Sequence, residues 1–127
     1  SYQSEGLARF DGSTTEWFQL PEGYSTSNVH TMVLAPDNTV WLATPDGLLQ
    51  FDGQNWQSTL ILDGIVDNDT QLITFDDLGQ MWVSTPSGLW RNDGSDWAPI
   101  LNSVNSSADI LAISSDGNGS IWVLTEN

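Results

Sequence analysis

Short apolar segments alternate with turn-forming segments along the whole chain. Stretches such as "TVWLAT" at 39–44 and "QMWVST" at 80–85 are rich in β-branched and aromatic residues and are bounded by Gly, Pro, Asp or Asn. Such residues favour strands, and no stretch shows the 3.6-residue periodicity of an amphipathic helix. The pattern therefore predicts an all-β protein built from short strands and tight turns.

These segments belong to a repeat of about 40 residues. Gly-Leu and Asp-Gly pairs recur at this step, and so do the only two basic residues, Arg9 and Arg91, with Gln50 at the intervening position. Two series of Trp keep the same step, and together they comprise Trp17, Trp41, Trp56, Trp82, Trp97 and Trp122. A fixed period of this length indicates a repeat architecture.

Each repeat unit reads as four strands. The first is expected at 29–34, with echoes at 70–75 and 110–115. The second is the segment that carries the first Trp, and the third is written "GLLQF", "GLWRN" or "GLARF". An Asp-Gly hairpin turn then leads to the fourth strand, which carries the second Trp.

Four antiparallel strands per repeat of this length is the organisation of a β-propeller blade. A blade buries both faces only between neighbours, and we expect the six Trp to form this structural core, with Trp41, Trp82 and Trp122 largely buried. Exposed Trp on successive blades would instead suit sugar stacking. Exposed aromatic residues in loops, such as Tyr24, would favour ligand sensing.

The second repeat combines these features with a leading Asp, in the order Asp76, Gly79, Trp82, Thr85, Gly88, Leu89, Arg91, Asp93 and Gly94. This pattern resembles the two-component-regulator propeller repeat of bacterial sensor proteins. The first repeat departs from it at Ala35 and Asn38, and the second at Asn92. The resemblance implies an extracytoplasmic module that senses sugars or other small molecules, with the ligand left open.

The order of the predicted strands splits one blade between the two ends of residues 1–127, giving three blades per chain. Propellers typically have four to eight blades, so we expect copies to complete one another, as a six-bladed homodimer or a nine-bladed trimer. The strand containing Gly6, Leu7 and Phe10 would pair with the strand containing Ile121, Val123 and Thr125 of another copy. The competing interpretation is a fragment of a longer propeller.

Charge narrows the choice of partners. The chain has 17 acidic and two basic residues and a net charge of −15. Nucleic acids and anionic membranes are bound by neutralising Lys and Arg, so neither is expected as a partner. Cys is absent, and no run reaches the roughly 18 apolar residues of a membrane helix. The bland explanation of the acidity is solubility or a saline habitat.

Little in the sequence points to catalysis, so we expect a non-catalytic scaffold or binding module without a cofactor. His30 is the single His, and neither a Gly-x-Ser-x-Gly elbow nor a glycine-rich phosphate loop occurs. A glycosidase that uses two channel carboxylates is the enzymatic alternative. Asp63, Asp67 and Asp69 offer oxygen ligands for Ca²⁺, but a solvated loop explains them as well.

Overall fold

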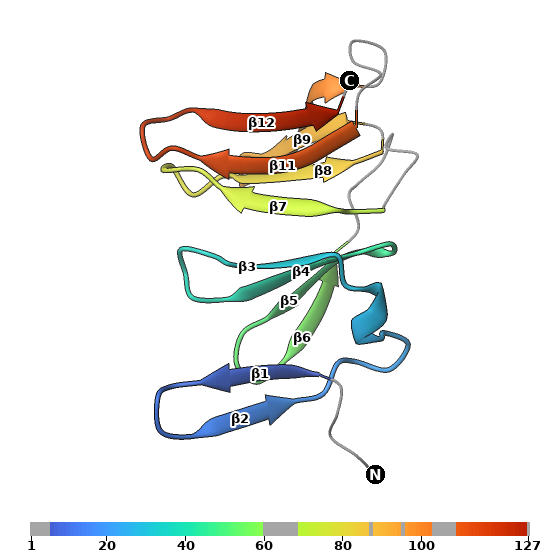
Figure 1. Ribbon diagram of the computed structural model, residues 1–127, viewed down its shortest axis with the longest axis vertical. Coiled ribbons are helices and arrows are strands. Elements are labelled where there is room, and N and C mark those ends of the chain that lie inside the picture. The colour runs from blue at the N-terminus through green and yellow to red at the C-terminus, as the bar shows by residue number, and fades with distance from the viewer. Residues whose placement is uncertain (1–5, 60–68, 87, 95, 103–108, 127) are drawn as a thin grey trace.

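Figure 1 shows the computed structural model, which describes residues 6–59, 69–86, 88–94, 96–102 and 109–126. The described chain is all-β apart from one 3-10 turn at Thr26–Asn28. Among the described residues, no helix has the length and apolar character needed to cross a membrane. The expectation of an all-β protein is confirmed.

The twelve strands of the described chain form four antiparallel sheets with two, four, four and two strands, and none of these sheets closes on itself. The first two sheets contain β1 (Leu7–Phe10) and β2 (Thr15–Phe18), then β3 (Thr31–Leu34), β4 (Val40–Thr44), β5 (Gly47–Phe51) and β6 (Trp56–Thr59). The other two contain β7 (Leu72–Phe75), β8 (Met81–Thr85), β9 (Gly88–Asn92) and β10 (Trp97–Asn102), then β11 (Asp109–Ser115) and β12 (Ile121–Glu126).

The sequence repeat predicts these strands closely. Each four-stranded sheet is one repeat unit in chain order, and β5 and β9 have the predicted bounds. The strands β3 and β7 begin two residues later than expected. Before β3, the 3-10 turn is capped by the Ser25 hydroxyl, and before β7, Thr70 is hydrogen-bonded to the neighbouring sheet.

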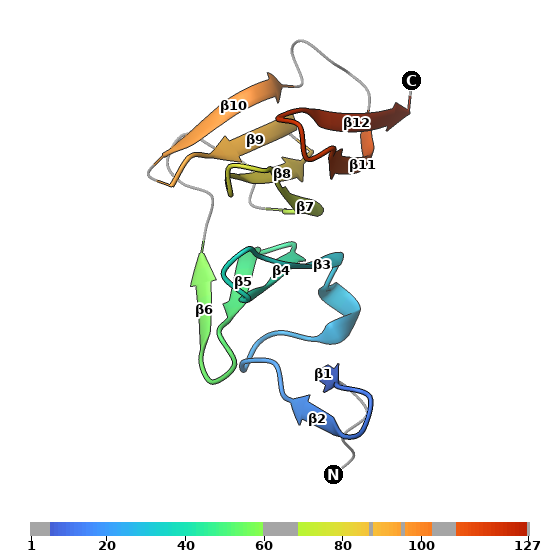
Figure 2. The ribbon, with the colours of Figure 1, turned by 90° about the vertical axis from the view of Figure 1, so that its left-hand side faces the viewer.

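The β1–β2, β3–β6 and β7–β10 sheets follow one another along the long axis of the molecule, and β11–β12 lies beside β7–β10 at the end opposite β1–β2 (Figure 1). The first strands of successive units, β3, β7 and β11, lie on one side, and β6 and β10 lie on the opposite side (Figure 2). The first strands of neighbouring sheets therefore lie close together, since β3 and β11 each contact β7.

The hydrophobic core lies between the two complete sheets. Ala43 and Leu48 come from the β3–β6 sheet, and Ile73, Met81 and Val83 come from the β7–β10 sheet. Partly buried side chains pack against this cluster, namely Val33, Trp41, Phe75 and Trp97. The alternation of strand side chains thus supplies both sheets with an apolar face.

The turn between the first and second strands explains one departure from the repeat pattern. Gly79 and Gly119 have positive φ angles of 81° and 90°, and Asn38, which stands at the equivalent place, has φ of 72°. Asn adopts this left-handed conformation more readily than other side-chain-bearing residues. The replacement of Gly by Asn in the first repeat therefore preserves the turn.

Candidate functional site

Aspartates tie the turns to the Trp residues of the second strands. The Asp76 Oδ1 atom accepts hydrogen bonds from the backbone N–H groups of Leu78 and Gln80, and its Oδ2 atom accepts one from Trp82 Nε1 at 2.9 Å. Asp116 Oδ2 accepts the same bond from Trp122 Nε1 at 3.2 Å. One carboxylate thus caps the turn and fixes the orientation of the indole ring.

In the first repeat the indole N–H group of the Trp is also hydrogen-bonded at the turn, but by different residues. Ala35 occupies the Asp position, and Trp41 Nε1 instead donates to Thr39 Oγ1 at 3.1 Å. The Thr39 hydroxyl in turn donates to Asp37 at 2.6 Å. This relay had no signature in the repeat pattern, because the sequence shows only the loss of the leading Asp.

Hydrogen bonds also set the ionisation of these carboxyls. Burial raises the pKa of Asp76, but the bonds from Trp82, Gln80 and Leu78 outweigh burial and hold the pKa below its usual value. Backbone N–H donors, foremost that of Asn118, and the Trp122 indole lower the pKa of Asp116. These aspartates are therefore structural anions.

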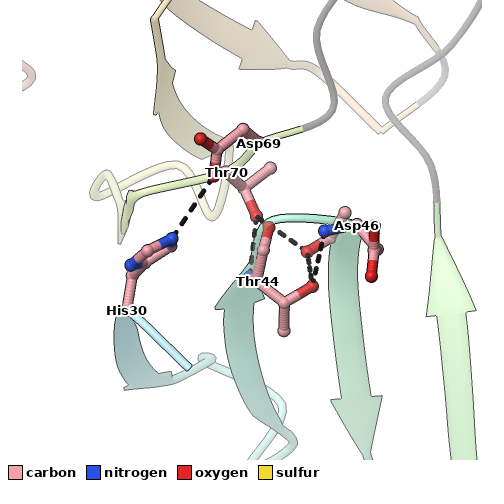
Figure 3. Close-up of polar contacts among 6 residues, drawn as sticks. His30, Thr44, Asp46, Asp69 and Thr70 are labelled. Atoms are coloured by element: carbon pink, nitrogen blue, oxygen red, sulfur yellow. Dashed lines mark hydrogen bonds and ion pairs between the residues drawn. The ribbon is translucent and has the colours of Figure 1, made fainter. Parts of the chain in front are cut away.

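Thr70, just before β7, connects the β7–β10 sheet to the ends of β4 and β5 in the β3–β6 sheet (Figure 3). It is fully buried, and its Oγ1 atom lies 2.8 Å from the carbonyl oxygen of Thr44 and 2.7 Å from that of Gly47. The same Oγ1 accepts a bond from the Thr44 backbone N–H at 3.0 Å. A single hydroxyl thus satisfies buried polar groups at the start of β5 and the end of β4.

The lone His is part of a second contact between these sheets. His30 Nε2 lies 3.3 Å from Asp69 Oδ1, and both side chains are partly exposed (Figure 3). His30 precedes β3 and Asp69 precedes β7, so the pair bridges adjacent sheets next to Thr70. Of the three candidate Ca²⁺ ligands, only Asp69 lies within the described residues, whereas Asp63 and Asp67 lie outside them. No group of three potential metal-ligating side chains occurs in the described part of the chain.

Large exposed hydrophobic side chains mark the most unusual surfaces of the molecule. They are found on the outer sheets and on the sheet surface next to β1–β2: Phe10, Trp17, Met32, Leu34, Leu111, Trp122 and Leu124. Leu78 in a turn and Ile100 on β10 are also exposed. An apolar surface of this kind signals an interaction site.

The exposed residues at the two ends correspond to residues that pack together in the core. Trp41 of the first complete sheet packs against the cluster that contains Ile73 of the second. In the repeat, Trp122 stands at the position of Trp41, and Met32 stands at the position of Ile73. Ile73 is only 7% exposed, but Met32 is 57% exposed. Trp122 and Met32 are therefore exposed at repeat positions whose counterparts, Trp41 and Ile73, belong to or pack against the core.

The outer sheets also have open edges. Among the described strands, β1 is paired only with β2, and β12 is paired only with β11. In both complete sheets the second strand of the unit is hydrogen-bonded to the third, as β4 is to β5 and β8 is to β9. In the repeat, β12 corresponds to a second strand and β1 to a third strand, so within the described residues the matching edge of each strand is unpaired. Unpaired edges of this kind are templates for strand addition.

A groove follows the open side of β1. A cavity of about 500 Å³ is lined by residues of β1 and β2, including Arg9 and Glu16, and by Met32 and Leu34 of β3. A second cavity of about 290 Å³ continues along Leu7 and Met32. Both cavities therefore lie between the β1–β2 sheet and the neighbouring β3–β6 sheet.

The predicted Trp core is thus only partly correct. Trp41, Trp56, Trp82 and Trp97 are half-buried, whereas Trp17 is 54% and Trp122 is 68% exposed. Trp17 and Trp122 lie in the two-stranded sheets, where one neighbouring sheet is missing, so the expectation of a buried Trp122 is wrong for the single chain. The Tyr24 side chain is half-buried. Of the residues expected to pair between copies, Phe10 and Thr125 are exposed, while Gly6, Leu7, Ile121 and Val123 are half-buried.

Comparisons of this chain with protein-family models, with curated proteins and with solved structures gave no match. The resemblance to the two-component-regulator propeller repeat rests on the residue pattern alone.

Proposed function

We propose that the chain is a self-assembling β-propeller module in which copies complete one another's blades. The proposal is supported by two observations: β11–β12 and β1–β2 are separate two-stranded sheets with open edges on β12 and β1, and in the sequence repeat they correspond to the first and second halves of a four-stranded unit. The two halves lie at opposite ends of the molecule (Figure 1), so one copy does not supply both halves of a blade. A second copy does.

A ring of two copies is the stoichiometry that best suits the fold. The twelve described strands amount to three blades of four, and propellers typically have four to eight blades. Two copies give six blades, whereas three copies give nine. Two identical junctions related by a twofold axis would close the ring without leaving an open edge.

A scaffold or binding role suits such a ring better than catalysis does. Polar side chains that could serve a reaction are instead used in the fold, because Asp76 caps a turn and holds Trp82, and Thr70 links two sheets. Whatever the ring binds would meet the loops between blades, as the family resemblance implies for extracytoplasmic sensors.

A second candidate is a ligand-binding module that acts as a single chain. Trp122 is 68% exposed, and the groove beside β1 offers apolar walls with Arg9 and Glu16 at its edge. Exposed Trp rings stack on sugars, so this reading makes the open surface a ligand site. It requires a monomer whose Trp fluorescence responds to added sugars.

Two matched substitutions separate these readings. Met32→Ser removes an apolar side chain from the proposed interface, and Leu78→Ser removes one that is 78% exposed in a turn outside it. Burial of a Met side chain contributes about 1.5–3 kcal/mol, so Met32→Ser should weaken self-association at least tenfold. Leu78→Ser should leave it unchanged. Sedimentation equilibrium measures both, and equal effects of the two substitutions would refute the proposed interface.

A further inference from the structure

We infer that Arg9 is an assembly residue, whose guanidinium covers the ring of Trp122 from a second copy. The inference rests on the proposed assembly and specifies how its junction is held. It follows from the in-chain behaviour of Arg91, from the strand register and from the charge of the molecule.

Arg91 shows what the arginine of this repeat does when its neighbour is present. Trp82 on β8 lies directly opposite Arg91 on β9. The Arg91 Cζ atom is 5.6 Å from the centre of the Trp82 ring. This is a cation–π contact between the second and third strands of one unit.

The register places Arg9 and Trp122 in the same relation. In both complete sheets the Trp of the second strand faces the residue three places after the Gly of the third, as Trp41 faces Gln50. When β12 pairs with β1 in this register, Trp122 faces Arg9, and Val123 faces Ala8. Val123 and Ala8 then share the opposite face of the sheet, because side chains alternate along a strand.

The residues around Arg9 leave its guanidinium group on the side of β1 where the second copy would bind. Arg9 forms an ion pair with Glu16, which lies opposite it on β2. Arg9 also lines the groove together with Met32 and Leu34, on the side that the incoming strand would cover. The ion pair holds the guanidinium on β1, between Glu16 and the position where the Trp122 ring would lie.

The scarcity of basic residues in the chain supports a specific role for Arg9 in this contact. Only two basic residues stand against 17 acidic ones, and both occupy the position that faces the Trp of the second strand. For Arg91 that Trp belongs to the same chain. For Arg9 the corresponding Trp is Trp122, which lies on the sheet at the opposite end of the molecule.

Cysteine cross-linking tests the register, since the chain contains no Cys of its own. Ala8→Cys and Val123→Cys chains are refolded together under oxidising conditions. Directly opposed positions suit a disulfide, so a covalent dimer containing one chain of each kind should form. The control pairs Ala8→Cys with Leu124→Cys, whose side chains would point to opposite faces. No cross-link in the first pair, or equal cross-linking in both, would overturn the register.

A double-mutant cycle tests the contact itself. Arg9→Gln, which copies the first repeat, should weaken self-association by about 2-fold to 30-fold for each of the two junctions, and in a Trp122→Leu background the same change should have less effect. Arg91→Gln makes the same charge change at a residue whose Trp partner lies in its own chain, so it should weaken self-association less than Arg9→Gln does. If the copies cross-link at 8 and 123 but Arg9→Gln has no effect, the inference fails and the proposed assembly stands. If no dimer forms, both fail.

Discussion

At the scale of the residue, side chains with the same place in the repeat have different environments. Trp82 and Trp122 make the same hydrogen bond to an aspartate six residues earlier, yet Trp82 is half-buried and Trp122 is exposed. The local bond depends on neighbours in sequence, and burial depends on the next sheet. The repeat therefore predicts the first and not the second.

The Asp76 anchor makes stability depend on pH. Asp76→Asn removes the charge and leaves an amide group that cannot accept from both backbone donors and from Trp82, so we expect a loss of about 1–2 kcal/mol at pH 7. The folded pKa of Asp76 is lowered, so its carboxylate stabilises the fold above the unfolded value of about 3.9 and ceases to do so as pH falls through the lowered pKa.

Denaturant titrations at pH 7 and at about pH 3 measure this effect. The difference between the native chain and Asp76→Asn should narrow at the lower pH. The matched control is Asp77→Asn, which makes the same charge change at the next, exposed position. A constant difference across this range, or an equal loss from the control, would show that the anchor does not act through its carboxylate.

At the scale of the element, the strands could be predicted from the sequence and the links between sheets could not. Period-locked residues such as the Gly at 47 and 88 start β5 and β9 where the pattern places them. Thr70 lacks an equivalent in the pattern, since Val29 and Ile110 occupy its place. Its bonds to Thr44 and Gly47 are long-range and leave no periodic signal.

Loss of the Thr70 hydroxyl should weaken the contact between the complete sheets. Thr70→Val keeps the shape but leaves the Thr44 N–H group without its acceptor, at a cost of about 1–3 kcal/mol. Thermal or denaturant unfolding measures the change. Thr74→Val, on β7 and outside this set of bonds, is the control and should change stability by less than about 0.5 kcal/mol. Equal effects would contradict the role given to Thr70.

At the scale of the whole molecule, the two-stranded sheets at the ends are the parts that differ most from the sequence-based expectation. Their exposed Trp17 and Trp122 are the residues for which the predicted burial failed. A sequence repeat shows that the halves of a unit match, but the fold of one chain shows that they lie at opposite ends. In the proposed ring, each of these separated halves pairs with the matching half of a second copy.

Salt should strengthen the assembly. Each copy carries a net charge of −15, so association brings strongly like-charged surfaces together. Raising NaCl from about 0.05 to 0.5 M shortens the screening length from more than about 10 Å to less than about 5 Å. We expect tighter self-association at the higher salt concentration, as measured by sedimentation. Weaker association at high salt would mean that attraction between charges, and not apolar burial, holds the copies together.

The mass of the folded protein in solution tests the central claim most directly. Native mass spectrometry or light scattering at micromolar concentration should find a species near twice 13.9 kDa. A species near three times that mass would favour the nine-bladed ring over the six-bladed one. A stable, folded monomer of 13.9 kDa would contradict the account, since the open edges and apolar surfaces of the outer sheets would then not be joined by a second copy.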